Sequence, residues 1–317
     1  MVQLSIAASH REARLADITL TNMTAADLIN MGDGLMRLSN FGRAAQAYAL
    51  ALELAPPGGL QLMIQVRQGI AQGSGRQRAG LHAALLKLED LGQNVFIGDG
   101  LATWQKTLPF LEDARFVELA AKHAHLLPIT NWHWNLQTVL WAVRQAKDVP
   151  GDFVELGVFK GHTTLFAAEY LGFETWPQRW LLYDTFEGIP EDQLDGDWKS
   201  RNEGTYKGTY SFEEVRERFA GFPNIEVVQG RVPEILEETA PDRIAFLHVD
   251  LNNSTAEIQA LDVLFDRLSP GGVIVFDDFA WKTARAQYEA ESRWFAARGL
   301  QVLALPTGQG LFVKAAA

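Results

Sequence analysis

The stretch that decides the fold runs from Phe153 to Gly161 and reads FVELGVFKG. Its first residues fit a buried strand, and its two glycines fit a tight turn that leads into a helix. Such a turn brings bare backbone and a helix N-terminus close to a small polar ligand. The stretch therefore predicts one strand of an open parallel sheet, with a ligand site at the carboxyl edge.

Three further apolar runs also end in acidic residues. They are LLYD at 181–184, AFLHVD at 245–250 and GVIVFDD at 272–278. The carboxyl ends of parallel strands meet at one edge of a sheet, so we expect these acids to gather there with Glu155. Ligands bind at that edge in open α/β sheets.

From Gly151 onward, predicted strands alternate with predicted helices, which is typical of a parallel sheet with right-handed crossovers. The strands are expected at 153–156, 180–184, 225–229, 244–250, 272–277, 300–304 and 310–314. The crossover helices are expected at 162–171, 211–220, 232–238, 255–268 and 283–298. The last two strands are joined by little more than PTGQ at 306–309, so they must pair antiparallel.

Residues 1–115 have a different, helical pattern that is rich in Ala and Leu. Between residues 25 and 56, small and aromatic residues fall at the spacings of a tetratricopeptide-like hairpin. They are Gly32, Ala44, Tyr48, Ala51 and Pro56. Unrelated helices that share small residues remain the alternative. A second helix pair is expected at 61–71 and 76–90, and residues 91–115 are interpreted as a connector.

We therefore expect two domains, an all-α region at 1–115 and an α/β domain at 116–317. The first is predicted to mediate self-association into a homo-oligomer or the binding of a partner. Before the sheet, helices are predicted at 114–125 and 134–147, and the second has an apolar face. The aromatic residues at 132–134 are interpreted as a packed corner, with a ligand wall as the alternative.

Composition excludes several classes of protein. The 317 residues contain no cysteine, which excludes disulfides and thiolate metal sites. The formal charge of −11 argues against nucleic acid as the main partner. No apolar run approaches the roughly 20 residues of a membrane span, and the first residues lack the order of a signal peptide. We expect a cytoplasmic protein with no membrane partner.

Five motifs, in this order, resemble S-adenosylmethionine-dependent methyltransferases of the macrocin-O-methyltransferase type. They are FVELGVFKG at 153–161, DTFEGIP at 184–190, LSPGG at 268–272, DDF at 277–279 and PTGQG at 306–310. The resemblance covers about residues 130–314. It implies a Rossmann-like class I methyltransferase sheet and transfer of a methyl group to a hydroxyl of a small-molecule acceptor, such as a sugar or a natural product.

The resemblance gives the glycine turn and the strand ends roles in cofactor binding. Gly157 and Gly161 would let the backbone approach the methionine part of the cofactor. Glu155 would accept hydrogen bonds from its ammonium group, and the helix start at Thr163 would meet its carboxylate. Asp184 would take both ribose hydroxyls. The alternative is that these acids cap neighbouring loops.

Further cofactor contacts follow from the same resemblance. Phe186 belongs to the second motif, and Gly230 and Arg231 follow the third strand, where relatives line the adenine pocket.

Asp250, Asp277 and Asp278 are predicted to form a metal site. Their strands would be neighbours, about 4.8 Å apart, so the carboxylates would converge and repel one another unless a cation lay among them. Oxygen ligands favour Mg²⁺, Mn²⁺ or Ca²⁺. In the resembled family this triad binds Mg²⁺, which lowers the pKa of the acceptor hydroxyl. The alternative is that one Asp serves the cofactor and another caps a turn.

One departure from the family puts the general base in doubt. The segment after Asp250 lacks the family's second Asp and has Asn252 nearby, and an amide does not accept a proton at neutral pH. We therefore assign catalysis to Asp250 and consider His162 as a substitute base, although it could be an ordinary residue of the helix N-terminus. His248 is interpreted as a core residue.

The polar segment 187–210 is expected to be a substrate lid, with a solvated loop as the alternative. Two other functions remain open. One is a metal-independent N- or O-methyltransferase, and the other is a helical-repeat scaffold that carries an inactive methyltransferase domain.

Overall fold

The computed structural model describes residues 23–38, 40–74, 95–104, 106–127, 131–194 and 202–315. The chain divides into two compact units. The first comprises Met1–Ile97 with Ala102–Lys106, and the second comprises Gly98–Leu101 with Thr107–Ala317. Among the described residues, every helix is too short or too polar to cross a lipid bilayer.

The described part of the first unit contains three helices, α1 (Ala25–Arg37), α2 (Phe41–Leu54) and α3 (Gly59–Ser74). A capping box between Thr24 and Asp27 begins α1. A Cβ atom at Gly32 would lie 2.4 Å from the ring of Tyr48, so only glycine lets α1 and α2 approach this closely. The tetratricopeptide-like character of this unit stays a prediction, and the expected helix at 76–90 lies outside the described residues.

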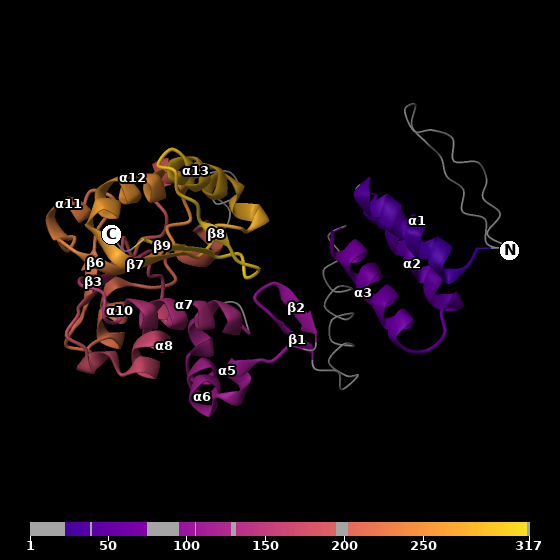
Figure 1. The fold of residues 1–317 in the computed structure, drawn as a ribbon, viewed down its shortest axis with the longest axis horizontal. Helices are drawn as coiled ribbons and strands as arrows, with labels where there is room; N and C mark the ends of the chain where they lie inside the picture. Colours follow the sequence, from indigo (N-terminus) through magenta and orange to yellow (C-terminus); the bar gives the residue numbers. More distant parts are fainter. Residues whose placement is uncertain are drawn as a thin grey trace. The chain divides into compact units, whose positions relative to one another are not determined.

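The second unit is built around a mixed seven-stranded sheet, as the sequence predicted (Figure 1). Its strands are β3 (Asp152–Leu156), β4 (Trp180–Asp184), β5 (Ile225–Gln229), β6 (Ile244–Val249), β7 (Leu268–Phe276), β8 (Leu303–Ala304) and β9 (Gly310–Val313). They lie in the order β5-β4-β3-β6-β7-β9-β8. The first five are parallel, and β9 pairs antiparallel with both β7 and β8.

Helices cover both faces of this sheet (Figure 1). On one face lie α7 (His133–Ala146) and α8 (His162–Leu171), with α5 (Pro109–Glu112) and α6 (Ala114–His123) against them. On the other face lie α11 (Leu236–Thr239), α12 (Ser254–Leu264) and α13 (Arg285–Ala296), while α10 (Phe212–Arg218) contacts β5. The predicted apolar face of α7 is buried, through Leu136, Val139, Leu140 and Val143.

Two boundaries differ from the sequence prediction. The connector expected at 91–115 contains a hairpin of β1 (Val95–Gly98) and β2 (Leu101–Trp104), followed by α5. Its turn has positive φ at both Asp99 (54°) and Gly100 (68°). An Asp-Gly pair is a strong signal for such a turn, but the flanking strands are too short to show alternation. In addition, β8 is confined to Leu303–Ala304, although a strand was expected over 300–304.

Candidate active site

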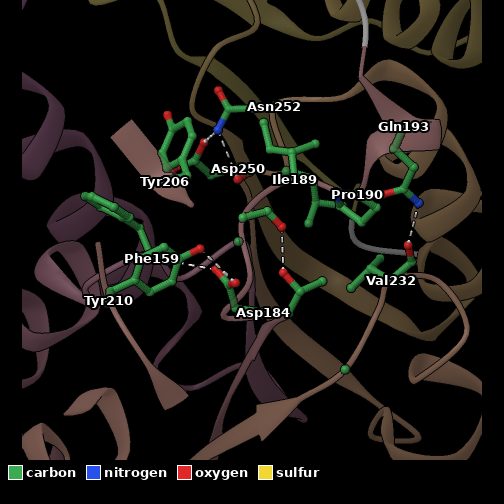
Figure 2. Close-up of a pocket in the computed structure, with 15 residues that line it drawn as sticks. Phe159, Asp184, Ile189, Pro190, Gln193, Tyr206, Tyr210, Val232, Asp250 and Asn252 are labelled. Atoms are coloured by element: carbon green, nitrogen blue, oxygen red, sulfur yellow. Dashed lines mark hydrogen bonds between the residues drawn. The ribbon is translucent and has the colours of Figure 1, made fainter. Parts of the chain in front are cut away.

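A cavity opens at the carboxyl edge of the sheet (Figure 2). Its wall includes the turn after β3, the residues after β4 and β5, and the end of β6. Named members of these groups are Gly157, Phe159, Asp184, Gly230 and Asp250. The position is where open α/β sheets bind ligands.

The glycine turn owes its composition to contacts within the protein. Gly157 has φ 83°, and a Cβ atom there would lie 1.9 Å from the carbonyl oxygen of Asp250. Gly161 has φ 74°, and its Cβ atom would lie 2.6 Å from the ring of Phe219. Gly157 also lines the cavity. Close approach to a cofactor remains a prediction for both glycines, beside this packing reason.

Asp184 receives four hydrogen bonds from the protein itself. Backbone N–H groups of Val158 and Phe159 donate to Oδ2 at 2.8 and 2.9 Å. The N–H of Phe186 and the hydroxyl of Tyr210 donate to Oδ1 at 2.7 and 3.1 Å. A carboxylate offers about four acceptor positions, so all are filled. Binding of ribose by Asp184 stays a prediction that requires a donor to leave, and Tyr210 is the side-chain donor among the four.

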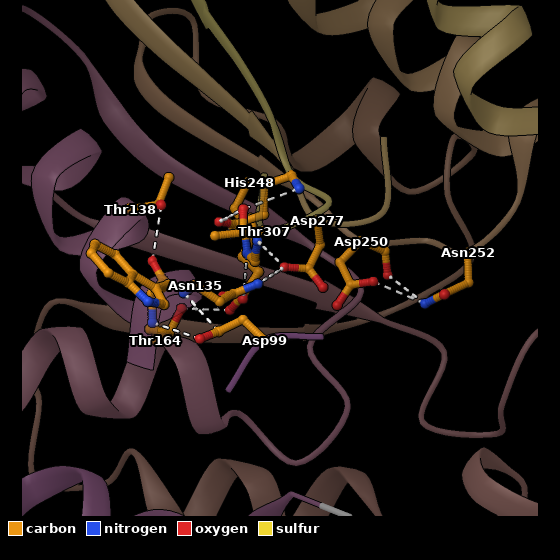
Figure 3. A network of polar contacts seen from close by, with 12 residues as sticks. Asp99, Asn135, Thr138, Thr164, His248, Asp250, Asn252, Asp277 and Thr307 are labelled. Atoms are coloured by element: carbon orange, nitrogen blue, oxygen red, sulfur yellow. Dashed lines mark hydrogen bonds and ion pairs between the residues drawn. The ribbon is translucent and has the colours of Figure 1, made fainter. Parts of the chain in front are cut away.

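Glu155 lies in a buried polar chain outside the cavity wall. Figure 3 shows two other members of this chain, Thr164 and His248. Its Oε2 accepts a hydrogen bond from the Thr164 hydroxyl at 2.5 Å, and its Oε1 lies 2.9 Å from Nδ1 of His248. Burial lowers the pKa of His248, but the carboxylates of Asp277 and Glu155 outweigh it and raise that pKa to about 9. His248 is thus buried as expected, but it is a charged bridge. The ammonium-binding role of Glu155 stays a prediction.

The three aspartates of the predicted metal site converge. Asp250 follows β6, Asp277 and Asp278 follow β7, and these two strands are paired. One carboxylate oxygen from each lies within 4.8 Å of the others. Burial and then the charges of Asp277 and Asp278 raise the pKa of Asp250 well above its usual value. This crowding of like charge is what a divalent cation would relieve.

Neighbouring side chains orient the acids of this cluster and change their pKa values. Burial raises the pKa of Asp277, but the hydrogen bonds and charge of His248 and the amide of Asn135 outweigh it, so that pKa is lowered. Asn135 Nδ2 donates to Asp277 Oδ1 at 2.8 Å. Asn252 Nδ2 donates to Asp250 Oδ1 at 2.9 Å, while its buried Oδ1 lacks a hydrogen-bond partner. An all-oxygen set with an unpaired amide oxygen beside it fits Mg²⁺ or Mn²⁺.

Two residues of this network were missed by sequence reasoning. Asp99, at the hairpin turn, accepts the backbone N–H groups of Trp134 and Asn135, each at 2.9 Å. It thereby caps α7, because the N-cap residue Trp132 has no capping side chain. Burial raises the pKa of Asp99 to about 6. The Asp-Gly turn signal could have drawn attention to Asp99, whereas nothing marked Asn135 within an apolar helix.

The structure does not bring His162 into the cavity wall. His162 is buried, and burial followed by the proximity of His123 and His125 on the α6 side lowers its pKa to about 4. It is therefore neutral and faces another helix, so its position gives no support to a role as base. Thr163, the next residue of α8, is partly exposed and also outside the cavity wall.

The remaining predicted cofactor residues divide into two groups. Gly230 lines the cavity. Phe186 does not, and its ring instead packs against Tyr210 at 6.0 Å between centroids. Arg231 forms a bidentate ion pair with Asp192, at 2.6 and 3.1 Å. Arg231 therefore holds the segment that was predicted to be a lid.

Both described parts of that segment line the cavity (Figure 2). Ile189, Pro190 and Gln193 come from its first part, and Tyr206 and Tyr210 come from its second. The two tyrosine rings lie edge-on to Phe159, with centroid distances of 5.3 and 4.9 Å. This arrangement supports the lid interpretation, while residues 195–201 lie outside the described residues.

The sheet order and the cavity at its carboxyl edge define a class I methyltransferase domain. Residues 132–301, more than half of the chain, match the family described as Macrocin-O-methyltransferase (TylF). The chain belongs to this family, which confirms the resemblance drawn from its motifs.

The individual relatives described next share less than 30% sequence identity with this chain. The chain is 29% identical over 167 residues to 8-demethyl-8-(2,3-dimethoxy-alpha-L-rhamnosyl)-tetracenomycin-C 4'-O-methyltransferase from Streptomyces olivaceus, which covers 50% of this chain and 62% of the relative. It is 28% identical over 142 residues to demethyldecarbamoylnovobiocin O-methyltransferase from Streptomyces niveus, which covers 42% of this chain and 54% of the relative. The chain thus spans little more than half the length of these curated relatives.

A solved structure shows the same fold. The O-methyltransferase NovP superposes with a TM-score of 0.52 and 22% identity, over 60% of this chain and 82% of NovP. At this identity the likeness establishes the fold alone.

Proposed function

We propose that the protein transfers a methyl group from S-adenosylmethionine to a hydroxyl of a small molecule, with a divalent cation at Asp250, Asp277 and Asp278. The observation that carries the proposal is the double position of Asp250. This residue lines the cavity and also belongs to the acid cluster. A cofactor in the cavity and an oxygen beside the cation would therefore be neighbours, which methyl transfer requires.

The cofactor would be held by the wall of the cavity. The turn from Gly157 to Phe159 and the residue Gly230 offer backbone and an aromatic ring, and Asp184 holds that turn in place through two N–H groups. Bound S-adenosylmethionine would supply the methyl group. The described lid residues, with Tyr206 and Tyr210 against Phe159, would exclude water from it.

A cation at the acid cluster would lower the pKa of the acceptor hydroxyl and orient it. His248 and Asn135 would keep Asp277 ionised and correctly turned. The unpaired Oδ1 of Asn252 would accept a hydrogen bond from the hydroxyl, but an amide cannot take its proton. We keep Asp250 as the catalytic group, because it alone among the described acids belongs to both the cavity and the cluster.

The acceptor that we favour is a sugar hydroxyl of a natural product. The names of two relatives specify a rhamnosyl tetracenomycin and mycinamicin III as the molecules methylated. The first test is titration calorimetry of the purified chain with S-adenosylmethionine, for which we expect 1:1 binding. No binding at millimolar cofactor would contradict the proposal.

The second test is turnover against a panel of hydroxylated natural products, with and without a chelator. Activity that disappears with the chelator and returns with Mg²⁺ or Mn²⁺ supports the cation. Full activity in excess chelator would favour a metal-independent methyltransferase. Cofactor binding without turnover on any acceptor would favour a scaffold with an inactive domain.

A further inference from the structure

Two tryptophans lie next to the acid cluster but outside the cofactor cavity. Trp281 follows Asp278 closely, and its backbone N–H donates to the carbonyl of Asp278 at 3.2 Å. Trp132 immediately precedes α7, the helix whose Asn135 holds Asp277. Neither tryptophan belongs to the residues that line the cavity.

The two indole rings form an aromatic pair with a fixed geometry. Their planes differ by 5°, and their centroids are 6.3 Å apart. A Cβ atom at Gly308 would lie 2.2 Å from Nε1 of Trp281, and one at Gly100 would lie 2.6 Å from the far edge of its ring. The backbone at Gly308 and at Gly100 therefore packs closely against two edges of this indole. Both tryptophans remain partly exposed to solvent.

The geometry of methyl transfer indicates where the acceptor would lie relative to these two tryptophans. The acceptor oxygen attacks in line, opposite the leaving sulfur, so the acceptor must lie beyond the cofactor cavity. Asp250 forms the wall of that cavity, and Asp277 and Asp278 belong to the same acid cluster without lining it. An acceptor whose hydroxyl reached this cluster would lie close to Trp281, whose backbone contacts that of Asp278.

The chemistry of the surface narrows the class of acceptor. The faces of indole rings carry partial negative charge and attract polarised C–H groups. Three carboxylates next to them disfavour an anionic group at the same place. A neutral ring with hydroxyls at its edge and C–H groups on its face satisfies both conditions.

We propose that Trp281 and Trp132 form the acceptor wall of this protein and that they bind the C–H face of a neutral sugar ring. The sugar would direct one hydroxyl toward Asp277 and Asp278. This inference rests on the proposed function and adds the residues that select the acceptor.

The test is saturation-transfer NMR on the full chain with Mg²⁺ and S-adenosylhomocysteine, using methyl α-L-rhamnopyranoside and methyl α-D-glucopyranoside as probes. We expect saturation of ring C–H protons for at least one probe. Trp281→Ala should lower the affinity for that probe about tenfold, as the loss of one aromatic stacking contact implies. Trp281→Phe should retain most of the affinity. Trp132→Leu should also weaken it.

Trp141→Ala provides the matched control, because Trp141 lies on α7 and its side chain is 44% exposed. It should bind the probe like the wild type. Calorimetry with S-adenosylhomocysteine should give the wild-type affinity for all variants, which shows that they are folded.

Two results would overturn the inference. One is wild-type probe affinity in both Trp281→Ala and Trp132→Leu. The other is a wild-type protein that binds S-adenosylhomocysteine but neither glycoside. Failure to bind S-adenosylhomocysteine would contradict the proposed function instead, and a tryptophan-dependent probe signal would then still support a sugar site.

Discussion

Two buried glutamates, one on α12 and one on α13, share a site that has room for only one negative charge. Glu257 and Glu291 are each 1% exposed, and Oε2 of each lacks a hydrogen-bond partner. Gln287 Nε2 donates to Glu257 Oε1 at 3.0 Å. Burial raises the pKa of both carboxyls, that of Glu257 to about 7. We therefore expect one proton to be shared between the unpaired oxygens.

This shared proton predicts a specific pH dependence of stability. The pKa of Glu257 is about 7 in the folded protein against 4.5 for an ordinary Glu, so folding strengthens proton binding. The resulting stabilisation is complete below 4.5 and is lost as the pH rises through 7. At about 1.4 kcal/mol per unit, the loss amounts to about 3 kcal/mol. Glu257→Gln should remove it, because the amide N–H replaces the proton and does not titrate.

The assay is urea unfolding of the wild type and of Glu257→Gln between about pH 5 and about pH 8.5. Across this range the unfolding free energy of the variant should rise relative to that of the wild type by about 2.5 kcal/mol. Glu289→Gln is the control, because Glu289 lies on α13 beside Glu291 in an exposed pair with Arg285 and should show a flat difference of less than about 1 kcal/mol. A difference for Glu257→Gln that is the same at both ends of the range would refute the shared proton.

Four other predictions concern the site, the cap of α7 and the helical unit. Asp184→Asn should lower the affinity for S-adenosylmethionine at least about tenfold in calorimetry, because the amide cannot accept hydrogen bonds from all four donors. A wild-type affinity would contradict this. Asp277→Asn should lower turnover far more than cofactor affinity, and an equal loss of both would place Asp277 on the cofactor side. Asp99→Ala removes the cap of α7 and should lower the free energy of unfolding by about 1 kcal/mol, with a wild-type value as the contrary result. If the helical unit mediates self-association, a chain of residues 116–317 should form particles with fewer subunits than the full chain. The measurement is the mass in solution divided by the mass of one chain.

The sequence predicted the parts of the site that depend on local pattern. Apolar runs ending in acids were enough to place Asp184, Asp250 and Asp277 at strand ends, because strand periodicity and the shared carboxyl edge are properties of short segments. The antiparallel ending followed from the length of a single connection. Each of these inferences needed no more than about ten consecutive residues.

The contacts that orient those acids could not be read in the same way. Asn135 reaches Asp277 across 142 residues of sequence, and Asp99 caps a helix that begins more than 30 residues later. Capping rules search the residues next to a helix start, so a cap supplied by a distant turn escapes them. The charge of His248 could not be predicted for the same reason, since it comes from partners at the ends of two other strands rather than from its own segment.

The contact between Gly157 and Asp250 has a consequence for how this enzyme family can change. A methyl group added at Gly157 would meet the carbonyl of Asp250 at 1.9 Å, so the turn or the end of β6 would have to move. In the proposed function, the turn at Gly157 would face the methyl donor and Asp250 would face the acceptor, and their backbones are packed directly against each other. Substitutions that retune the acceptor by shifting Asp250 would disturb the donor as well. New acceptor specificities are therefore expected to arise from the tryptophan side and the lid, where side chains can change without moving that contact.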